Sequence, residues 1–160
     1  MFEKVFTILQ YRPCVHEYVY KNEMFFLPMM QSLVQEKRVE VLEKHSIVKS
    51  QEQESLYALQ WRQLYHDING TFPSLSPDSD VFSFRESGKN LGEIHSLLSA
   101  KILGIPYFCS NDHGSKYLAK RLSTSKRTVT ILTLHDVVEQ EKVKLLLSNT
   151  QRRGLLSLHK

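Results

Sequence analysis

Residues 91–112, LGEIHSLLSAKILGIPYFCSND, join an apolar helix to an apolar strand through one short turn. The helix is expected from Leu91 to Leu103, where a glycine marks its end. The strand is expected over Ile105–Cys109. Two carboxylates flank this unit, because Glu93 falls in the first turn of the helix and Asp112 follows the strand. The segment predicts one helix–strand unit of an α/β protein, with acidic groups beside it.

The same alternation continues on the C-terminal side of this unit. A helix is expected over about 113–122, a strand over 128–133 and a helix over about 134–147. Residues 149–160 form a basic segment, which is expected to be a loosely ordered tail.

Helices and strands also alternate on the N-terminal side. Between 17 and 37 a helix is expected that Pro28 should kink or divide. Proline, serine and glycine are dense from 70 to 90, which indicates a loop or an irregular crossover. The remaining elements are helices at 2–9 and 51–68 and short strands at 12–15 and 38–44. Together these elements predict a three-layer α/β/α sandwich with a parallel sheet.

Composition favours one soluble domain over 1–160, because 41% of the 160 residues are hydrophobic and 24% are charged. No apolar run approaches the ~20 residues that span a bilayer, and no signal peptide is visible. We therefore expect a cytoplasmic protein without a membrane partner. Cys14 and Cys109 lie in short apolar runs, so we expect buried free thiols and no disulfide bond.

The charge is uneven along the chain. Residues 1–100 carry 10 basic and 13 acidic side chains, a net charge of −3. Residues 101–160 carry 11 basic and 4 acidic side chains, a net charge of +7. A basic half can attract a polyanion such as nucleic acid, but a solvated basic face explains the charge equally well.

Three carboxylates stand where apolar packing is expected. Glu23 and Glu93 share helical stripes with apolar residues, and Asp112 stands at the carboxyl end of a strand, where open α/β sheets bind ligands. Carboxylates that converge repel one another unless a cation lies among them, and oxygen ligands suit Mg²⁺ or Mn²⁺. Each residue also has a structural alternative: a surface position for Glu23, a favourable helix-dipole position for Glu93 and an N-cap for Asp112.

Residues 92–112, GEIHSLLSAKILGIPYFCSND, resemble the second half of a PIN domain. The matching features are Gly92-Glu93, the helix after them, LGIP at 103–106, the apolar strand, and Ser110-Asn111-Asp112. The segment CVHEYVYKNEM, 14–24, is similar to the strand-to-helix segment of the family, in which Glu23 would be the acidic residue. The resemblance extends from about residue 12 to 138.

The resemblance implies a metal-dependent endoribonuclease. Glu23, Glu93 and Asp112 would be catalytic and would hold Mg²⁺ or Mn²⁺ for in-line attack on an RNA phosphodiester. Asp136, after the next strand, could approach as a fourth metal ligand or cap the following helix. Ser110 would shape the site. The candidates for contacts with RNA phosphates are Lys89, Lys116, Lys120 and Arg121, each of which could also be an ordinary surface residue.

The chain departs from the family at its start. PIN domains open with a central strand that ends in an aspartate, but no aspartate precedes Asp67 here. Either the chain starts downstream of the true start or it is a shortened relative. Loss of a central strand would leave two strand edges unpaired and would weaken or abolish nuclease activity. Such a chain could pair with another copy as a homodimer.

Two classes of function follow. The first is a PIN-like ribonuclease, for example the toxin of a toxin–antitoxin pair that a small antitoxin-like protein neutralises. The second is a non-catalytic PIN-derived domain that binds protein or nucleic acid. The seven histidines show no zinc-binding spacing, and packing or surface roles are expected even for His16 and His95, which are close to the proposed site.

Overall fold

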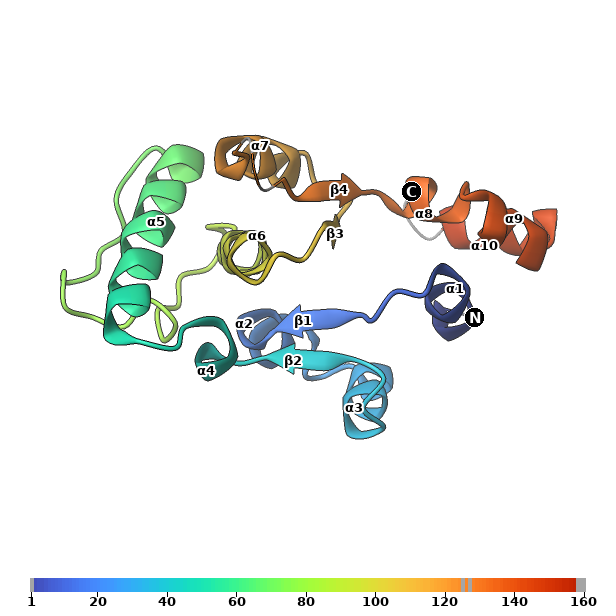
Figure 1. Cartoon of the computed structure of the whole chain (residues 1–160), viewed down its shortest axis with the longest axis horizontal. Helices are drawn as coiled ribbons and strands as arrows, with labels where there is room; N and C mark the ends of the chain where they lie inside the picture. Colours follow the sequence, from blue (N-terminus) through green and yellow to red (C-terminus); the bar gives the residue numbers. More distant parts are fainter. Residues whose placement is uncertain (1, 125, 127, 158–160) are drawn as a thin grey trace.

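The computed structural model, which describes residues 2–124, 126 and 128–157, is a mostly helical α/β structure (Figure 1). Its strands form two separate two-stranded parallel sheets. β1 (Cys14–His16) pairs with β2 (Glu40–Leu42), and β3 (Tyr107–Cys109) pairs with β4 (Thr130–Leu132). The expected α/β class and parallel pairing are therefore confirmed. The single sheet of a three-layer sandwich is not seen, because no described strand joins the β1–β2 pair to the β3–β4 pair.

The segment after β1 is divided at a proline, as expected. The short helix α2 (Glu17–Val19) continues into a π-helical stretch, η1 (Tyr20–Met24). A new helix, α3 (Pro28–Gln35), then starts with Pro28 in its first turn. Proline is tolerated there because a first-turn N–H has no partner within the helix.

The long helix α5 (Gln51–Asn69) supplies one wall of the main core. It follows the single-turn helix α4 (Lys44–Ile47) and begins at Ser50, whose side chain accepts a hydrogen bond from the Gln53 N–H at 3.2 Å. It ends at Gly70, which takes a left-handed conformation with φ 72°. The aromatic and apolar side chains Tyr57, Trp61, Leu64 and Tyr65 point from α5 into the core.

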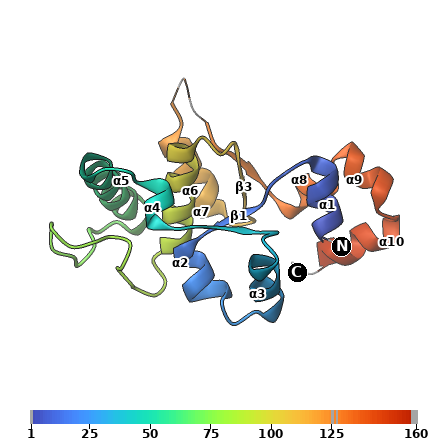
Figure 2. The ribbon, with the colours of Figure 1, turned by 60° about the horizontal axis from the view of Figure 1, so that its bottom comes forward.

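Helix α6 (Leu91–Leu103) lies at the centre of the molecule (Figure 2). It packs against α2, α5, α7 (His113–Leu122), β1 and β3. Ile94, Leu97 and Leu98 have no exposed surface. Because α6 contacts one strand of each sheet, it is the element that holds the two sheets in one fold.

The two ends of the chain meet in a second, smaller core. Helix α1 (Phe2–Leu9) packs against α9 (Glu141–Leu146), and α8 (Leu134–Val138) packs against α9 and α10 (Asn149–Ser157). The terminal cluster, as we name it, contains Val5, Leu9, Val137, Val138, Val143, Leu147 and Leu155. The single helix expected over 134–147 is thus two helices. Residues 149–157, expected in a loose tail, form α10, and the end of that tail lies outside the described residues.

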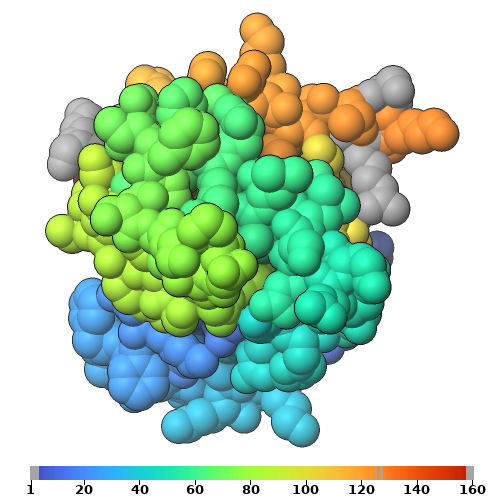
Figure 3. All heavy atoms as spheres, turned by 90° about the vertical axis from the view of Figure 1, so that its left-hand side faces the viewer, coloured from blue at the N-terminus to red at the C-terminus, as the bar shows by residue number. Residues whose placement is uncertain are grey.

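The loop between α5 and α6 is irregular, as expected, but it is firmly packed. Arg62 of α5 donates hydrogen bonds to the carbonyl oxygens of Leu75 and Ser76 at 3.1 and 2.6 Å. Val81 and Phe82 are buried in the main core. Figure 3 shows α5 and this loop together forming one side of the molecular surface.

Two other expectations concern the cysteines and the membrane. Cys14 and Cys109 are free thiols, as expected, but Cys14 is only half-buried and Cys109 is exposed. Of the helices in the described residues, none combines the length and apolar character that a bilayer span requires.

Candidate functional site

Two of the predicted carboxylates come together. Glu23 in η1 lies against the first turn of α6, so that a Cβ atom added at Gly92 would stand 2.5 Å from Glu23 Oε1. Glu93 is the next residue in α6. Partial burial raises the pKa of Glu23, and the negative charge of Glu93 raises it further. The structure therefore places two like charges near each other, at the contact between η1 and α6.

The glycine in this contact explains how the carboxylate can come so close. Val19 Cγ2 would lie 3.1 Å from a Cβ atom at Gly92, so the turn that carries Glu23 packs directly on the α6 backbone. Any larger residue at position 92 would push the Glu23 side chain away. Close packing of Glu23 and Val19 therefore explains the glycine at position 92, which is also part of the sequence motif.

Asp112 is the N-cap of α7, the structural alternative that the sequence also allowed. Its Oδ1 atom accepts a hydrogen bond from the Gly114 N–H at 3.0 Å. Ser110 supports the same turn, because its Oγ accepts hydrogen bonds from the Asp112 N–H and the Ser115 hydroxyl, both at 3.0 Å. Ser110 therefore shapes the loop that carries Asp112.

Asp136 forms a reciprocal capping box at the start of α8. Its Oδ2 accepts hydrogen bonds from the Thr133 hydroxyl at 2.6 Å and from the Thr133 N–H at 2.8 Å. The Asp136 N–H donates to Thr133 Oγ1 at 3.1 Å. The Thr133 hydroxyl and N–H lower the pKa of Asp136. The capping interpretation of Asp136 is confirmed.

The four carboxylates do not form one cluster. Within residues 2–124, 126 and 128–157, no group of three or more His, Cys, Asp or Glu side chains is arranged to hold a metal ion. The donor set that fits a hard cation is the pair Glu23 and Glu93. Mg²⁺ is commonly held by one or two carboxylates, with waters and substrate phosphates completing its shell, so a two-carboxylate site is chemically sufficient.

The predicted basic residues fall into three situations. Lys116, Lys120 and Tyr117 are exposed on α7, and Tyr117 is 48% exposed. Arg121 is engaged, because its Nε and Nη2 atoms donate to Asp67 Oδ2 at 3.0 and 2.8 Å. Lys89 is half-buried before α6. The exposed side of α7 is thus basic and aromatic.

Sequence reasoning missed a buried histidine network next to β1 and α6. The Trp61 indole N–H donates to His95 Nε2 at 3.1 Å, so the proton of neutral His95 is on Nδ1, which lies 2.8 Å from the Tyr57 hydroxyl. The His16 ring stacks on His95 with centroids 4.8 Å apart, and its Nδ1 accepts the Tyr18 N–H at 3.0 Å. The spacing of four between Tyr57 and Trp61 was the only sequence signal, since it puts both polar groups on one face of α5.

Burial dominates the titration of both histidines. It lowers the pKa of His16 to about 4, with a smaller contribution from the Arg85 charge and an opposing one from Glu17. Burial lowers the pKa of His95 as well, and the neighbouring His16 acts in the same direction. Both rings are therefore neutral packing groups at neutral pH, as the packing interpretation expected.

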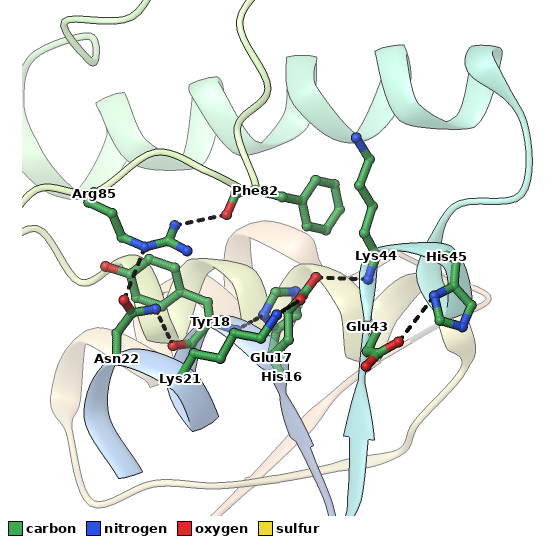
Figure 4. Close-up of polar contacts among 10 residues, drawn as sticks. All are labelled: His16, Glu17, Tyr18, Lys21, Asn22, Glu43, Lys44, His45, Phe82 and Arg85. Carbon is green, nitrogen blue, oxygen red and sulfur yellow. Dashed lines mark hydrogen bonds and ion pairs between the residues drawn. The ribbon is translucent and has the colours of Figure 1, made fainter. Parts of the chain in front are cut away.

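Charged side chains surround this network (Figure 4). Glu17 accepts the Lys44 N–H at 2.9 Å through Oε1 and pairs with Lys21 Nζ at 2.8 Å through Oε2. Arg85 from the loop lies over the Tyr18 ring, with its guanidinium carbon 4.7 Å from the ring centroid, and donates to Asn22 Oδ1 at 3.0 Å. These contacts fasten α2, α4 and the loop around the histidines, which makes this region a structural rather than an open site.

Comparisons with protein-family models, with curated proteins and with solved structures found no match. The resemblance to the PIN family therefore stays a prediction from the motif residues.

Proposed function

We propose that the chain is a PIN-like protein that binds Mg²⁺ or Mn²⁺ through Glu23 and Glu93 and acts on RNA. The proposal rests on the position of the Glu23 carboxylate against Gly92, beside Glu93 in α6, and on the pKa of Glu23, which burial and the Glu93 charge both raise. Two neighbouring carboxylates repel each other, and a divalent cation would turn that repulsion into attraction. Glu23 and Glu93 are two of the residues that the resemblance assigns to the metal, together with Asp112.

The fold that belongs to this proposal is a PIN-like three-layer sandwich. In it, the β1–β2 and β3–β4 pairs would be parts of one parallel sheet. Asp112 follows β3 and caps α7 through Oδ1, so the proposed metal site consists of Glu23 and Glu93. Weak catalysis is expected because the described residues bring two carboxylates near each other but form no group of three or more metal ligands.

RNA would be bound through the basic and aromatic side of α7. Lys116 and Lys120 are exposed there, and the exposed Tyr117 on the same helix offers a ring on which a base can stack. Bound Mg²⁺ would supply an activated water and stabilise the phosphate oxyanions. The chain's own residues would hold the phosphates and, through Ser110, keep the Asp112 loop in place.

Calorimetric titration with Mn²⁺ tests the metal part. Glu23→Gln and Glu93→Gln should each weaken Mn²⁺ binding by about tenfold or more, because each removes one of two anionic ligands. The matched control is Asp78→Asn, an exposed carboxylate in the loop between α5 and α6. Unchanged Mn²⁺ affinity in both glutamate variants would refute the site.

RNA assays test the proposed cleavage of RNA and its binding through α7. Cleavage of a labelled single-stranded RNA should be slow, should require Mg²⁺ or Mn²⁺ and should disappear in Glu93→Gln. In EDTA, Lys116→Ala combined with Lys120→Ala should weaken RNA binding and reduce its salt dependence by about two counterions. Cleavage that persists in EDTA would contradict the mechanism.

The second candidate is a non-catalytic binding domain. It is favoured by the observation that no three-ligand cluster exists in the described residues, while Asp112 and Asp136 serve as helix caps. In this case RNA would bind through α7 without being cleaved at any Mn²⁺ concentration. A small antitoxin-like partner remains a prediction for either candidate.

A further inference from the structure

A cavity lies beyond the carboxyl ends of β3 and β4. It has a volume of about 370 Å³ and is lined by Asn111, Leu134, His135 and Leu156. Asn111 follows β3, whereas Leu134 and His135 follow β4 in α8. Leu156 comes from α10, which packs on α8 (Figure 1). Open parallel sheets bind ligands at the carboxyl ends of their strands, so this cavity, the strand-end pocket, has the position of a ligand site.

The side chain of Asn111 is held in one orientation at this pocket. Its Oδ1 atom accepts a hydrogen bond from the Leu134 N–H at 3.0 Å, which joins the loop after β3 to the start of α8. Because that bond assigns Oδ1, the Nδ2 atom is the end of the amide that remains for another molecule. Within residues 2–124, 126 and 128–157, no acceptor for Nδ2 is found. The pocket therefore offers a positioned N–H donor.

The other walls suit a flat, partly apolar ligand. Leu134 and Leu156 are partly buried and pack against the terminal cluster, so each still presents some apolar surface. His135 is exposed, and its ring can stack on a planar group. The volume falls in the usual range of about 300–1,000 Å³ for pockets that bind small molecules. A nucleotide base fits this chemistry, because it has flat faces that stack on aromatic rings and hydrogen-bond acceptors on its edges.

The charges around the pocket favour a phosphate on the side of α7. Hydrogen bonds from Thr133 lower the pKa of Asp136, and the nearby charge of Lys116 lowers it further. Since Asp136 follows His135 directly, the exposed Lys116 is close to the pocket. Glu139, just after α8, is already paired with a lysine and an arginine. Lys116 is therefore the charged group suited to hold a phosphate beside a base in the pocket.

We infer that the strand-end pocket binds one ribonucleotide, with the base against Asn111 and the His135 ring and the phosphate toward Lys116. The inference rests on the proposed action on RNA, of which the bound ribonucleotide would be one unpaired residue. It adds to that proposal a place where a single base is recognised. The pocket uses neither Glu23 nor Glu93, so this binding needs no metal ion and is tested without one.

Nucleotide titrations in EDTA test the pocket on the intact protein. The probes are AMP, GMP, CMP and UMP, followed by NMR of the isotope-labelled chain. At least one should cause saturable shifts of the Asn111 side-chain amide and of the Leu134 and His135 backbone amides. Ribose 5-phosphate, which lacks the base, should bind about tenfold more weakly or less. Equal binding of ribose 5-phosphate or of N-acetyltryptophanamide would overturn the inference, as would saturable shifts with none of the four nucleotides.

The ring of His135 is tested by a pair of substitutions at this exposed position. His135→Ala should weaken the nucleotide that binds best by about fivefold or more, because a stacking surface is lost. His135→Phe keeps a flat ring and should bind within about twofold of wild type. His45→Ala, at an exposed histidine of α4, is the matched control and should change nothing. Wild-type affinity in His135→Ala would overturn the inference.

The donor of Asn111 is tested by Asn111→Asp. This change keeps an oxygen for the Leu134 N–H and removes Nδ2, so the loop stays attached to α8 while the donor is lost. The ligand is then the uncharged nucleoside, since the new carboxylate would repel a phosphate. Binding should weaken by about threefold to tenfold. Unchanged binding would show that Asn111 does not read the base, and the inference would fail.

The pocket and the proposed function can fail separately. If metal-dependent RNA cleavage is observed but no nucleotide shifts the Asn111 amide, the pocket inference fails and the proposed function stands. If nucleotides bind at the pocket but RNA is neither bound nor cleaved, the proposed function fails. The pocket would then be a site for free mononucleotides, which supports the inference and changes only the source of its ligand.

Discussion

At the residue scale, His16 and His95 are polar side chains that pack as neutral rings in the core. His16 is 2% exposed and His95 has no exposed surface, yet each ring has at least one satisfied nitrogen. A neutral ring suits this environment, because the cost of burying a protonated ring exceeds what the nearby Glu17 charge returns at His16. The histidines should therefore make stability depend on pH.

Acid should destabilise the protein well above the pH at which carboxylates titrate. The folded-state pKa of His16, about 4, is below the ordinary histidine pKa of 6.5. The unfolded chain therefore binds the proton first, so stability is fully present above pH 6.5 and is lost as pH falls toward 4. Urea unfolding should show a loss of about 2 kcal/mol from His16 alone between pH 6.5 and 5. His95 should add to this loss.

The variant that checks this is His16→Phe, which keeps a stacked ring and removes the titrating group. Its unfolding free energy should fall less steeply with acid than that of wild type. His45→Gln alters an exposed histidine that contacts Glu43 at 3.2 Å, and it should leave the slope nearly unchanged. Identical slopes in wild type and His16→Phe would show that burial does not control the acid response.

Replacing a helical glycine with alanine should affect stability differently at Gly154 and at Gly92. A Cβ atom at Gly154 in α10 meets nothing within 4 Å, so Gly154→Ala should stabilise the protein by about 0.5–1 kcal/mol through helix propensity. A Cβ atom at Gly92 meets Glu23 Oε1 at 2.5 Å, so Gly92→Ala must displace that carboxylate. It should gain less stability and lose Mn²⁺ affinity. Equal gains in thermal unfolding would mean that Glu23 does not lie on α6.

At the scale of single elements, helix caps explain the positions of several polar side chains without any catalysis. Ser50, Asp112 and Thr133 begin α5, α7 and α8, and each accepts a hydrogen bond from a first-turn N–H. A cap and a metal ligand can be the same residue. The two roles must therefore be separated by the choice of substitution.

Asp112 allows this separation. Asparagine is as good an N-cap as aspartate, so Asp112→Asn should keep the stability of wild type within about 0.5 kcal/mol. Asp112→Ala removes the bond to the Gly114 N–H and should cost about 1 kcal/mol in chemical denaturation. Any loss of Mn²⁺ binding in the asparagine variant can then be assigned to charge. If both variants were equally unstable, the negative charge at the helix dipole would outweigh the cap bond.

At the scale of the whole molecule, local patterns could be predicted and long-range pairing could not. The periodicity of α1, α5, α6 and α7, the glycine at 104 and the division at Pro28 are local signals, and the structure confirms them. Strand pairing depends on partners far along the chain, so the break into two sheets was not visible. The position of Glu23 beside the Gly92-Glu93 pair could be anticipated from the motif, but the capping bonds of Asp112 and Asp136 give these residues roles that spacing left open.

The histidine network and α10 were harder to foresee for a different reason. The ring contacts of His16 join three segments, β1, α6 and the loop that carries Phe82, and no local window contains them all. Helix α10 lies in a basic, polar segment, and its burial depends mainly on Leu155 in the terminal cluster. Tertiary contacts, rather than propensity, decide both features.

The division into a main core and a terminal cluster predicts two levels of stability. Val143 and Leu118 both have no exposed surface, but Val143 belongs to the terminal cluster and Leu118 to the main core. Leu118→Ala should cost about 2–5 kcal/mol and raise amide hydrogen exchange throughout the protein. Val143→Ala should speed exchange mainly in α1, α9 and α10, because these helices can open while α5 and α6 stay packed. A uniform rise in exchange in the Val143 variant would show that both cores unfold as one cooperative unit, with the contacts at Tyr11 and β4 strong enough to couple them.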